Sequence, residues 1–135
     1  MNDFNSRIIS EFRSSGGIVD GPFSRMPLLL LHHTGARTGT QRVSPLAYRK
    51  VNGGWAVFAS KAGADTNPGW FHNLLANPMA SIEIGTETVD VRARVAEGEE
   101  HDTIWEAQKT EFSNFADYER KTRRDRIPVV ILEPA

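Results

Sequence analysis

The dipeptide Asn52-Gly53 separates two runs of β-forming side chains, residues 42–51 and 55–60. Asn-Gly is the strongest short hairpin signal, because both central positions of a type I′ turn need positive φ angles. A third run, residues 27–33, is apolar up to two histidines and is too short for a typical helix. The three runs predict a meander of antiparallel strands.

Three further segments have the patterns of strands. Polar and apolar residues alternate in residues 79–84 and 88–95 on either side of Gly85, which predicts a second hairpin with one buried face. Residues 127–132 are another apolar run and predict a closing strand. Six short strands with few helices fit an α+β, mainly β fold, in which a small barrel of mostly antiparallel strands carries flanking helices.

Helices are expected in four other segments. In residues 5–13, Ile8, Ile9 and Phe12 form one apolar side, which predicts a short amphipathic helix packed against the body of the protein. The alternative for this helix is a loosely held arm that touches a membrane surface. The other predicted helices are residues 68–76 with Asn67 as the N-cap, residues 97–112 and residues 115–121.

The length of 135 residues fits a single domain, with residues 1–26 as an N-terminal helix and lead-in and residues 27–135 as the barrel. The chain has no cysteine, which excludes disulfides, thiolate catalysis and cysteine-ligated metals. The formal net charge of −1 argues against general nucleic-acid binding. The first residues lack the basic start and apolar core of a signal peptide, so a cytoplasmic location is expected.

Residues 28–64 contain five cationic side chains and neither aspartate nor glutamate. Two glycines flank Arg37 in the predicted loop of residues 34–39, which would present backbone N–H groups beside a guanidinium. Amides and a bidentate arginine together suit a phosphate or carboxylate. The alternative is a plain connection between strands. The five cations are Arg37, Arg42, Arg49, Lys50 and Lys61.

The histidines do not form a recognisable metal site. His32 and His33 are neighbours on a predicted strand, so their side chains point to opposite faces and at most one of them faces a ligand. His72 and His101 have no ligand partner at a suitable spacing. We therefore expect no bound metal.

Ser60 lies at a predicted strand end, where a hydroxyl and a backbone N–H could meet a heteroaromatic edge or serve only in a turn. No Gly-x-Ser-x-Gly motif supports a serine hydrolase. At the start of the predicted helix 68–76, one of Trp70 and Phe71 is expected in the core, and His72 and Asn73 are left for a ligand. The basic run 120–126 is interpreted as a solvated helix face, with a nucleic-acid patch as the alternative.

Five motifs together resemble the deazaflavin-dependent nitroreductase family. They are Leu-His-His-Thr-Gly-Ala-Arg-Thr-Gly at 31–39, Gln-Arg-Val-Ser-Pro-Leu at 41–46, residues 57–64, residues 67–74, and Arg-Ile-Pro-Val-Val at 126–130. The resemblance implies a split β-barrel that binds coenzyme F(420), a deazaflavin whose tail carries a phosphate and an oligoglutamate. Such a tail suits the basic segment without acidic residues.

The resemblance also implies the residues that would contact the cofactor and the substrate. Lining of the tail and ribityl chain is implied for Ala36, Arg37, Thr38, Arg42, Val43, Ser44, Pro45, Leu46 and Ala47. A position beside the deazaflavin ring is implied for Phe58, Ala59, Ser60 and Lys61. Contact with the phosphate or tail from the helix is implied for Gly69, Trp70, Phe71, His72 and Asn73. Ser60 would hydrogen-bond the ring or substrate, and Tyr118 would cover the substrate side as a candidate proton donor.

The implied activity is hydride transfer from reduced coenzyme F(420) to a small electron-poor acceptor, a quinone, enone or nitro compound. The alternatives are an FMN-dependent oxidoreductase and a non-catalytic binder of a cofactor or lipid. The expected partner is the acceptor itself, with no nucleic acid and with the chain as a monomer or homodimer. Membrane-surface contact through the first helix stays as an alternative to a purely cytoplasmic protein.

Overall fold

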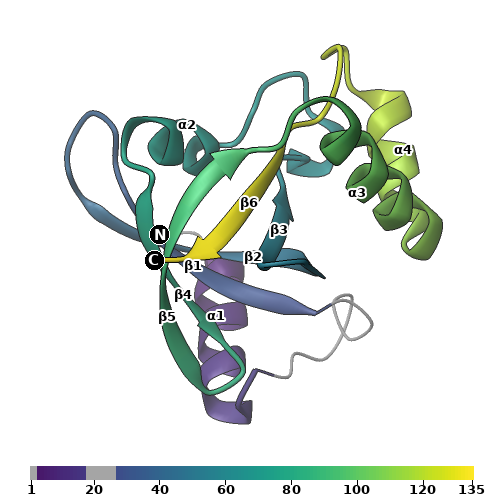
Figure 1. The fold of residues 1–135 in the computed structure, drawn as a ribbon. Helices are drawn as coiled ribbons and strands as arrows, with labels where there is room; N and C mark the ends of the chain where they lie inside the picture. Colours follow the sequence, from purple (N-terminus) through teal and green to yellow (C-terminus); the bar gives the residue numbers. More distant parts are fainter. Residues whose placement is uncertain (1–2, 18–26) are drawn as a thin grey trace.

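The computed structural model describes residues 3–17 and 27–135, so the expected lead-in lies largely outside the described residues. Figure 1 shows a strand barrel with helices on several sides. The strands are β1 (Leu28–Thr34), β2 (Gln41–Val51), β3 (Gly54–Phe58), β4 (Met79–Ile84), β5 (Glu87–Val95) and β6 (Val129–Pro134). The helices are α1 (Asp3–Ser15), α2 (Gly69–Ala76), α3 (Gly98–Glu111) and α4 (Ser113–Lys121), with a 3₁₀ turn, η2, at Lys61–Gly63.

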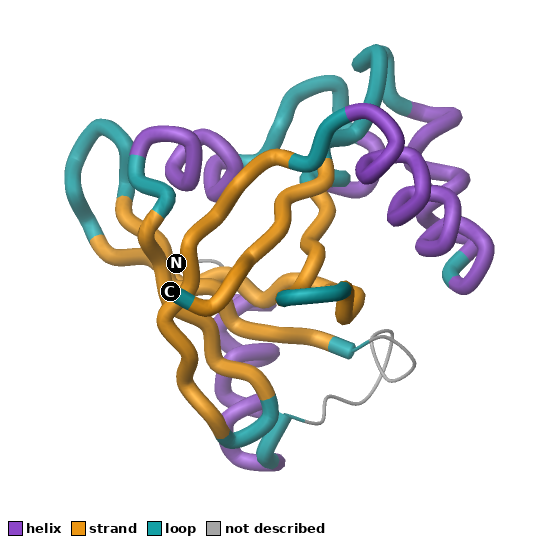
Figure 2. The backbone as a smooth tube through the Cα atoms, viewed as in Figure 1, coloured by secondary structure: helices purple, strands orange, loops and turns teal. Residues whose placement is uncertain are grey.

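The six strands close into a barrel in the order β1-β2-β3-β6-β5-β4. Every neighbouring pair is antiparallel, and β1 closes the ring by pairing with both β2 and β4. Figure 2 shows the strands as one continuous layer, with the helices outside it. The predicted mainly antiparallel barrel is therefore confirmed.

The uninterrupted apolar run of β1 is explained by burial on both faces. Leu29 and Leu31 point into the barrel, whereas Leu28 and Leu30 pack against α1. The same division applies to β3 and β6, whose outer residues pack under α3 and α4. These strands lack polar alternation because neither face meets water.

Helix α1 lies against β1 and β2, and its apolar side is buried. Ile8, Ile9 and Phe12 form a cluster with the outer leucines of β1. At the end of α1, Arg13 forms an ion pair with Glu83 of β4, with Nη2 and Oε2 2.7 Å apart. Packing against the body, rather than a free membrane arm, is what the structure shows. None of the described helices has the length and apolarity needed to cross a membrane.

Helix α2 lies at one end of the barrel, where Trp70, Phe71 and Leu74 join the interior cluster. It begins at Gly69 after Pro68, and no side chain caps it. The predicted N-cap role of Asn67 is wrong, because its Oδ1 accepts a hydrogen bond from Arg124 instead. Strand β3 ends at Phe58, so Ser60 follows the strand and precedes the 3₁₀ turn.

Candidate active site

A cleft with a cavity volume of about 200 Å³, partly open to solvent, lies among β2, the end of β3, the 3₁₀ turn, the start of α2, and α4. Eight of the residues predicted for the site line it, although they come from distant parts of the sequence. They are Pro45, Leu46, Ala47, Phe58, Ser60, Lys61, Trp70 and Tyr118. The fold thus brings three of the four residues implied beside the ring (Phe58, Ser60 and Lys61) together with Tyr118 and with four residues implied for the tail.

Aromatic rings form much of the cleft wall. Phe58 and Phe115 meet edge to face with centroids 5.5 Å apart, and Tyr118 meets Phe115 at 5.4 Å. The hydroxyl of Tyr118 accepts a hydrogen bond of 3.2 Å from Asn114 Nδ2, which leaves the phenolic proton to donate elsewhere. Apolar walls with a few polar groups suit a flat heteroaromatic ligand.

The turn at the cleft has an unusual backbone. Lys61 and Ala62 have φ angles of 47° and 52°, and Gly63 follows at 81°. Consecutive residues other than glycine in this region are costly and are often found at functional sites. A Cβ at Gly63 would lie 3.0 Å from the carbonyl oxygen of Tyr118, so glycine lets the turn pack directly on α4.

The glycine loop between β1 and β2 is tied to α2 through a chain of hydrogen bonds. The Ala36 N–H donates to Asn73 Oδ1 at 2.9 Å, and Asn73 Nδ2 donates to His33 Nδ1 at 2.9 Å. His33 Nε2 lies 2.9 Å from Ser44 Oγ. Because Nδ1 accepts the hydrogen bond from Asn73, the proton of neutral His33 is on Nε2, which donates to Ser44 Oγ. The hydroxyl proton of Ser44 then stays available to a ligand.

His33 is buried with only 3% of its surface exposed. Burial, with smaller contributions from the positive charge of Arg42 and from His32, lowers the pKa of His33 from 6.5 to about 4. At neutral pH the ring is therefore uncharged, as the hydrogen-bond chain requires. The side chain of His32 points to the other face of β1, where its Nε2 lies 2.5 Å from Glu83 Oε2. The prediction that His32 and His33 point to opposite faces is therefore confirmed.

The five cations of the acid-free segment divide into two groups. Arg37 and Arg42 are exposed near the glycine loop and form no ion pair with any carboxylate in the described parts of the chain. Lys61 lies at the cleft and donates to Thr66 Oγ1 at 3.2 Å. Arg49 instead pairs with Glu111 of α3 at 2.6 Å, and Lys50 is exposed beside the β2–β3 turn. The absence of acidic residues from segment 28–64 suggested that all five charges are free for an anion. This is wrong for Arg49, which a carboxylate from outside the segment neutralises.

Several predicted site residues do not reach the cleft. Val43 packs toward α1, and Ala59 and Phe71 are buried in the barrel interior. Ala36, Thr38 and Gly69 are exposed on the loop and at the start of α2, and His72 is exposed on that helix. Conversely, the cleft includes Ala62, Pro68 and Asn114, which the sequence did not single out.

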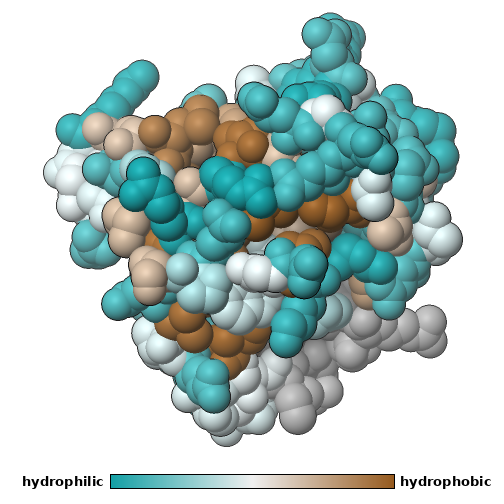
Figure 3. Space-filling model, in the orientation of Figure 1, coloured by the Kyte–Doolittle hydropathy of each residue, from teal (hydrophilic) through white to brown (hydrophobic). Residues whose placement is uncertain are grey.

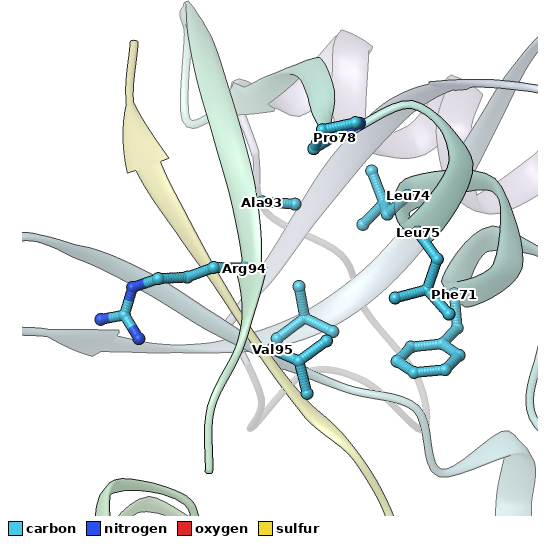
Figure 4. A pocket seen from close by; sticks show the side chains of 8 residues that line it. Phe71, Leu74, Leu75, Pro78, Ala93, Arg94 and Val95 are labelled. Carbon is cyan, nitrogen blue, oxygen red and sulfur yellow. The ribbon is translucent and has the colours of Figure 1, made fainter.

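A second, apolar pocket with a cavity volume of about 120 Å³ lies between α2 and β5. Figure 4 shows Phe71, Leu74 and Leu75 beside Val95, with the Arg94 side chain pointing away from them. Leu75 is 56% exposed, and Figure 3 shows apolar surface gathered around α2. This pocket shares no lining residue with the cleft.

The model of the F420H(2)-dependent quinone reductase family matches residues 6–134. The chain belongs to this family. An F420H(2)-dependent quinone reductase of Mycobacterium tuberculosis (strain ATCC 25618 / H37Rv) is 37% identical over 109 residues, which cover 78% of this chain and 72% of that protein. Coenzyme F(420) is the cofactor of this family, which confirms the expected family, cofactor and oxidoreductase class.

Solved structures agree with this assignment. A structure titled an F420-H2 dependent reductase has a TM-score of 0.71 and 37% identity, and covers 86% of this chain and 97% of its own. Another, titled a domain-swapped dimer, has a TM-score of 0.73 and 36% identity, with 97% and 98% of the two chains covered. The expected split β-barrel is thereby confirmed.

Proposed function

We propose that this chain is an oxidoreductase that passes a hydride from reduced coenzyme F(420) to a quinone-type acceptor. The observation that supports it most is the convergence of eight implied site residues on one cleft. Bound there, the cofactor would supply the hydride from C5 of its deazaflavin ring. The protein would supply position, electrostatics and exclusion of water on one side of the ring.

The cleft fits the ring of this cofactor. Phe58 and Trp70 give it flat apolar walls, and Ser60 gives it a hydroxyl at the edge. Tyr118 and Asn114 line the cleft from α4, which packs on the 3₁₀ turn at Gly63. In this arrangement Ser60 would hydrogen-bond the ring or the acceptor, and Tyr118 would hold a proton near the acceptor oxygen.

The anionic tail fits the glycine loop. Arg37 and Arg42 have no described carboxylate to neutralise them, and the Ser44 hydroxyl retains a proton to donate. Asn73 holds the loop by accepting from the Ala36 N–H. A phosphate and glutamates would bind these cations through charge-assisted hydrogen bonds, while the shorter tail of FMN would reach fewer of them.

Fluorescence titration with oxidised coenzyme F(420), beside FMN, tests the proposal. We expect binding of F(420) in the micromolar range or tighter, with FMN at least about tenfold weaker. Oxidation of the reduced cofactor by a simple quinone such as menadione, followed by absorbance, then tests turnover. Tight binding without oxidation by quinones, enones or nitro compounds would favour the carrier alternative.

A further inference from the structure

The segment after α4 is fastened to the loop that forms one wall of the cleft. The hydroxyl of Thr122 donates to the Ala64 carbonyl at 2.8 Å, and the Arg123 N–H donates to Asp65 Oδ1 at 2.9 Å. This segment belongs to the basic run that its sequence suggested was a solvated helix face. The structure corrects that interpretation for Arg124, which is half-buried.

The guanidinium of Arg124 donates to four acceptors from three parts of the chain. Nη1 donates to the Ala59 carbonyl at 2.8 Å and to Asn67 Oδ1 at 2.6 Å, and Nη2 donates to the Ser60 carbonyl at 2.8 Å. Nε donates to Thr122 Oγ1 at 2.9 Å. Burial lowers the pKa of Arg124, with Asp65 opposing this effect, yet arginine stays charged.

These bonds fix how the peptide groups at Ala59 and Ser60 are oriented. In a trans peptide the N–H points opposite to the carbonyl, and none of the described peptide bonds is cis. The N–H groups of Ser60 and Lys61 therefore point away from Arg124. Arg124 itself does not line the cleft, whereas Ser60 and Lys61 do.

The backbone angles of the turn bring these N–H groups together. Ser60 is in the right-handed region, with φ −73° and ψ −42°, and Ala62 is in the left-handed region, with φ 52° and ψ 32°. Lys61 between them has a φ of 47°. A right-handed residue followed by a left-handed one gathers successive N–H groups into a concavity that binds an anionic or carbonyl oxygen.

We propose that Arg124 is a positioning residue, which holds the Ala59 and Ser60 carbonyls so that the N–H groups of Ser60, Lys61 and Ala62 form an oxygen-binding nest in the cleft. The identity of the oxygen, a carbonyl of the deazaflavin ring, rests on the proposed function. The positioning itself does not. The hydrogen bonds of Arg124 to these two carbonyls also help to offset the backbone strain at Lys61 and Ala62.

Arginine suits this role because its planar fork spans two neighbouring carbonyls and a side-chain amide at once. Lysine has three donors around one nitrogen and cannot reproduce that spacing. Arg124→Lys therefore keeps the charge but loses the fork. Arg126→Lys, two residues away at an exposed position, is the matched control.

Amide hydrogen exchange in the ligand-free protein tests the positioning. The Gly63 and Ala64 N–H groups donate to the carbonyls of Ser60 and Lys61 at 3.0 Å each, so their exchange reports whether the turn is formed. We expect exchange to be about tenfold faster in Arg124→Lys and unchanged in Arg126→Lys. Asn67→Ala, which removes one anchor and retains Arg124, should give a smaller increase. Equal exchange in wild type and Arg124→Lys would overturn the proposal whether or not any cofactor binds.

Binding of a deazaflavin that lacks the phosphate and glutamate tail tests the nest. In Arg124→Lys we expect its dissociation constant, and that of whole coenzyme F(420), to rise by the same factor of about ten, a loss of about 1.4 kcal/mol. Arg37→Ala should weaken only the whole cofactor. If Arg124→Lys weakened only the whole cofactor, the nest would not face the ring. If the wild type bound neither ligand, the proposed function would be wrong, and so would the assignment of a deazaflavin carbonyl to the nest. The positioning role of Arg124 would then be decided by the hydrogen-exchange experiment alone.

Discussion

Asn73 Nδ2, on the second turn of α2, donates a 2.9 Å hydrogen bond to Nδ1 of His33 on β1. The same amide accepts from the Ala36 N–H, so one asparagine joins the glycine loop to the buried imidazole. A proton on His33 Nδ1 would place two donors face to face and break this chain. The loop expected to bind the cofactor tail therefore depends on an uncharged histidine.

His33 should make the stability of the protein depend on pH on the acid side. Its pKa is about 4 in the folded protein against 6.5 in the unfolded chain, so below pH 6.5 the unfolded chain binds a proton that the folded protein does not. The free energy of unfolding therefore has its full value above pH 6.5, and it falls by up to about 3 kcal/mol as the pH approaches 4. The melting temperatures at pH 7.5 and about 4.5 should differ more in wild type than in His33→Gln.

The control for this prediction is His72→Gln, because His72 is exposed on α2. This variant retains all the carboxylates of the wild type, including Glu83, whose pKa is lowered mainly by its hydrogen bond to Arg13. It should keep the pH dependence of the wild type. The same dependence in all three proteins would mean that His33 is not the group responsible.

The division among the basic residues predicts different results for alanine variants. Arg37→Ala and Arg42→Ala should each weaken binding of coenzyme F(420) about tenfold at low salt, and less at high salt, because these exposed charges are screened. Arg49→Ala should leave the affinity unchanged, since Arg49 is paired with Glu111. It should lower the free energy of unfolding by about 1–3 kcal/mol, because it also removes the 3.3 Å hydrogen bond from Arg49 Nη1 to Oε1 of the buried Gln108. Titrations at two salt concentrations measure these effects, and an equal loss of affinity in all three variants would contradict the assignment.

The strands could be predicted because their signals are local. Asn52-Gly53 and the alternation around Gly85 specify hairpins through turn geometry and burial of one face. The unbroken apolar run of β1 indicated a buried strand, and α1 on its outer side explains why no polar residue alternates there. The basic glycine loop likewise indicated an anion site from composition alone.

The pairing of charges could not be predicted, because it depends on which elements pack together. Arg49 on β2 meets Glu111 only because the fold brings the end of α3 next to it, although the two residues are 62 positions apart along the chain. Arg124 belongs to a basic run with alternating exposure, and only the fold shows that its guanidinium turns inward to the cleft loop. Asn67 was predicted to cap α2, because the sequence does not show that Arg124 donates to its side-chain oxygen instead.

Gly54 is expected to be essential for closing the barrel between β3 and β6. A Cβ at this position would lie 2.2 Å from the carbonyl oxygen of Leu132, and the backbone of β6 cannot move aside without breaking the sheet. Gly54→Ala should therefore lower the free energy of unfolding by about 3 kcal/mol or more. Gly69→Ala is the control, because a Cβ there meets nothing within 4 Å. Urea unfolding of the two variants measures the difference, and equal midpoints would contradict this account.

Tyr118 is expected to aid proton delivery to the acceptor rather than cofactor binding. Its hydroxyl accepts from Asn114 and so keeps its proton for another partner, while its ring forms part of the cleft wall beside Phe115. Because the cleft is partly open, solvent can replace the hydroxyl at a cost, and Tyr118→Phe should lower kcat/KM for the quinone by about tenfold. The dissociation constant of oxidised coenzyme F(420) should not change. Steady-state kinetics measure the effect on kcat/KM, and titration measures the effect on cofactor binding. If kcat/KM fell by less than about twofold, Tyr118 would only form part of the cleft wall, and solvent would supply the proton.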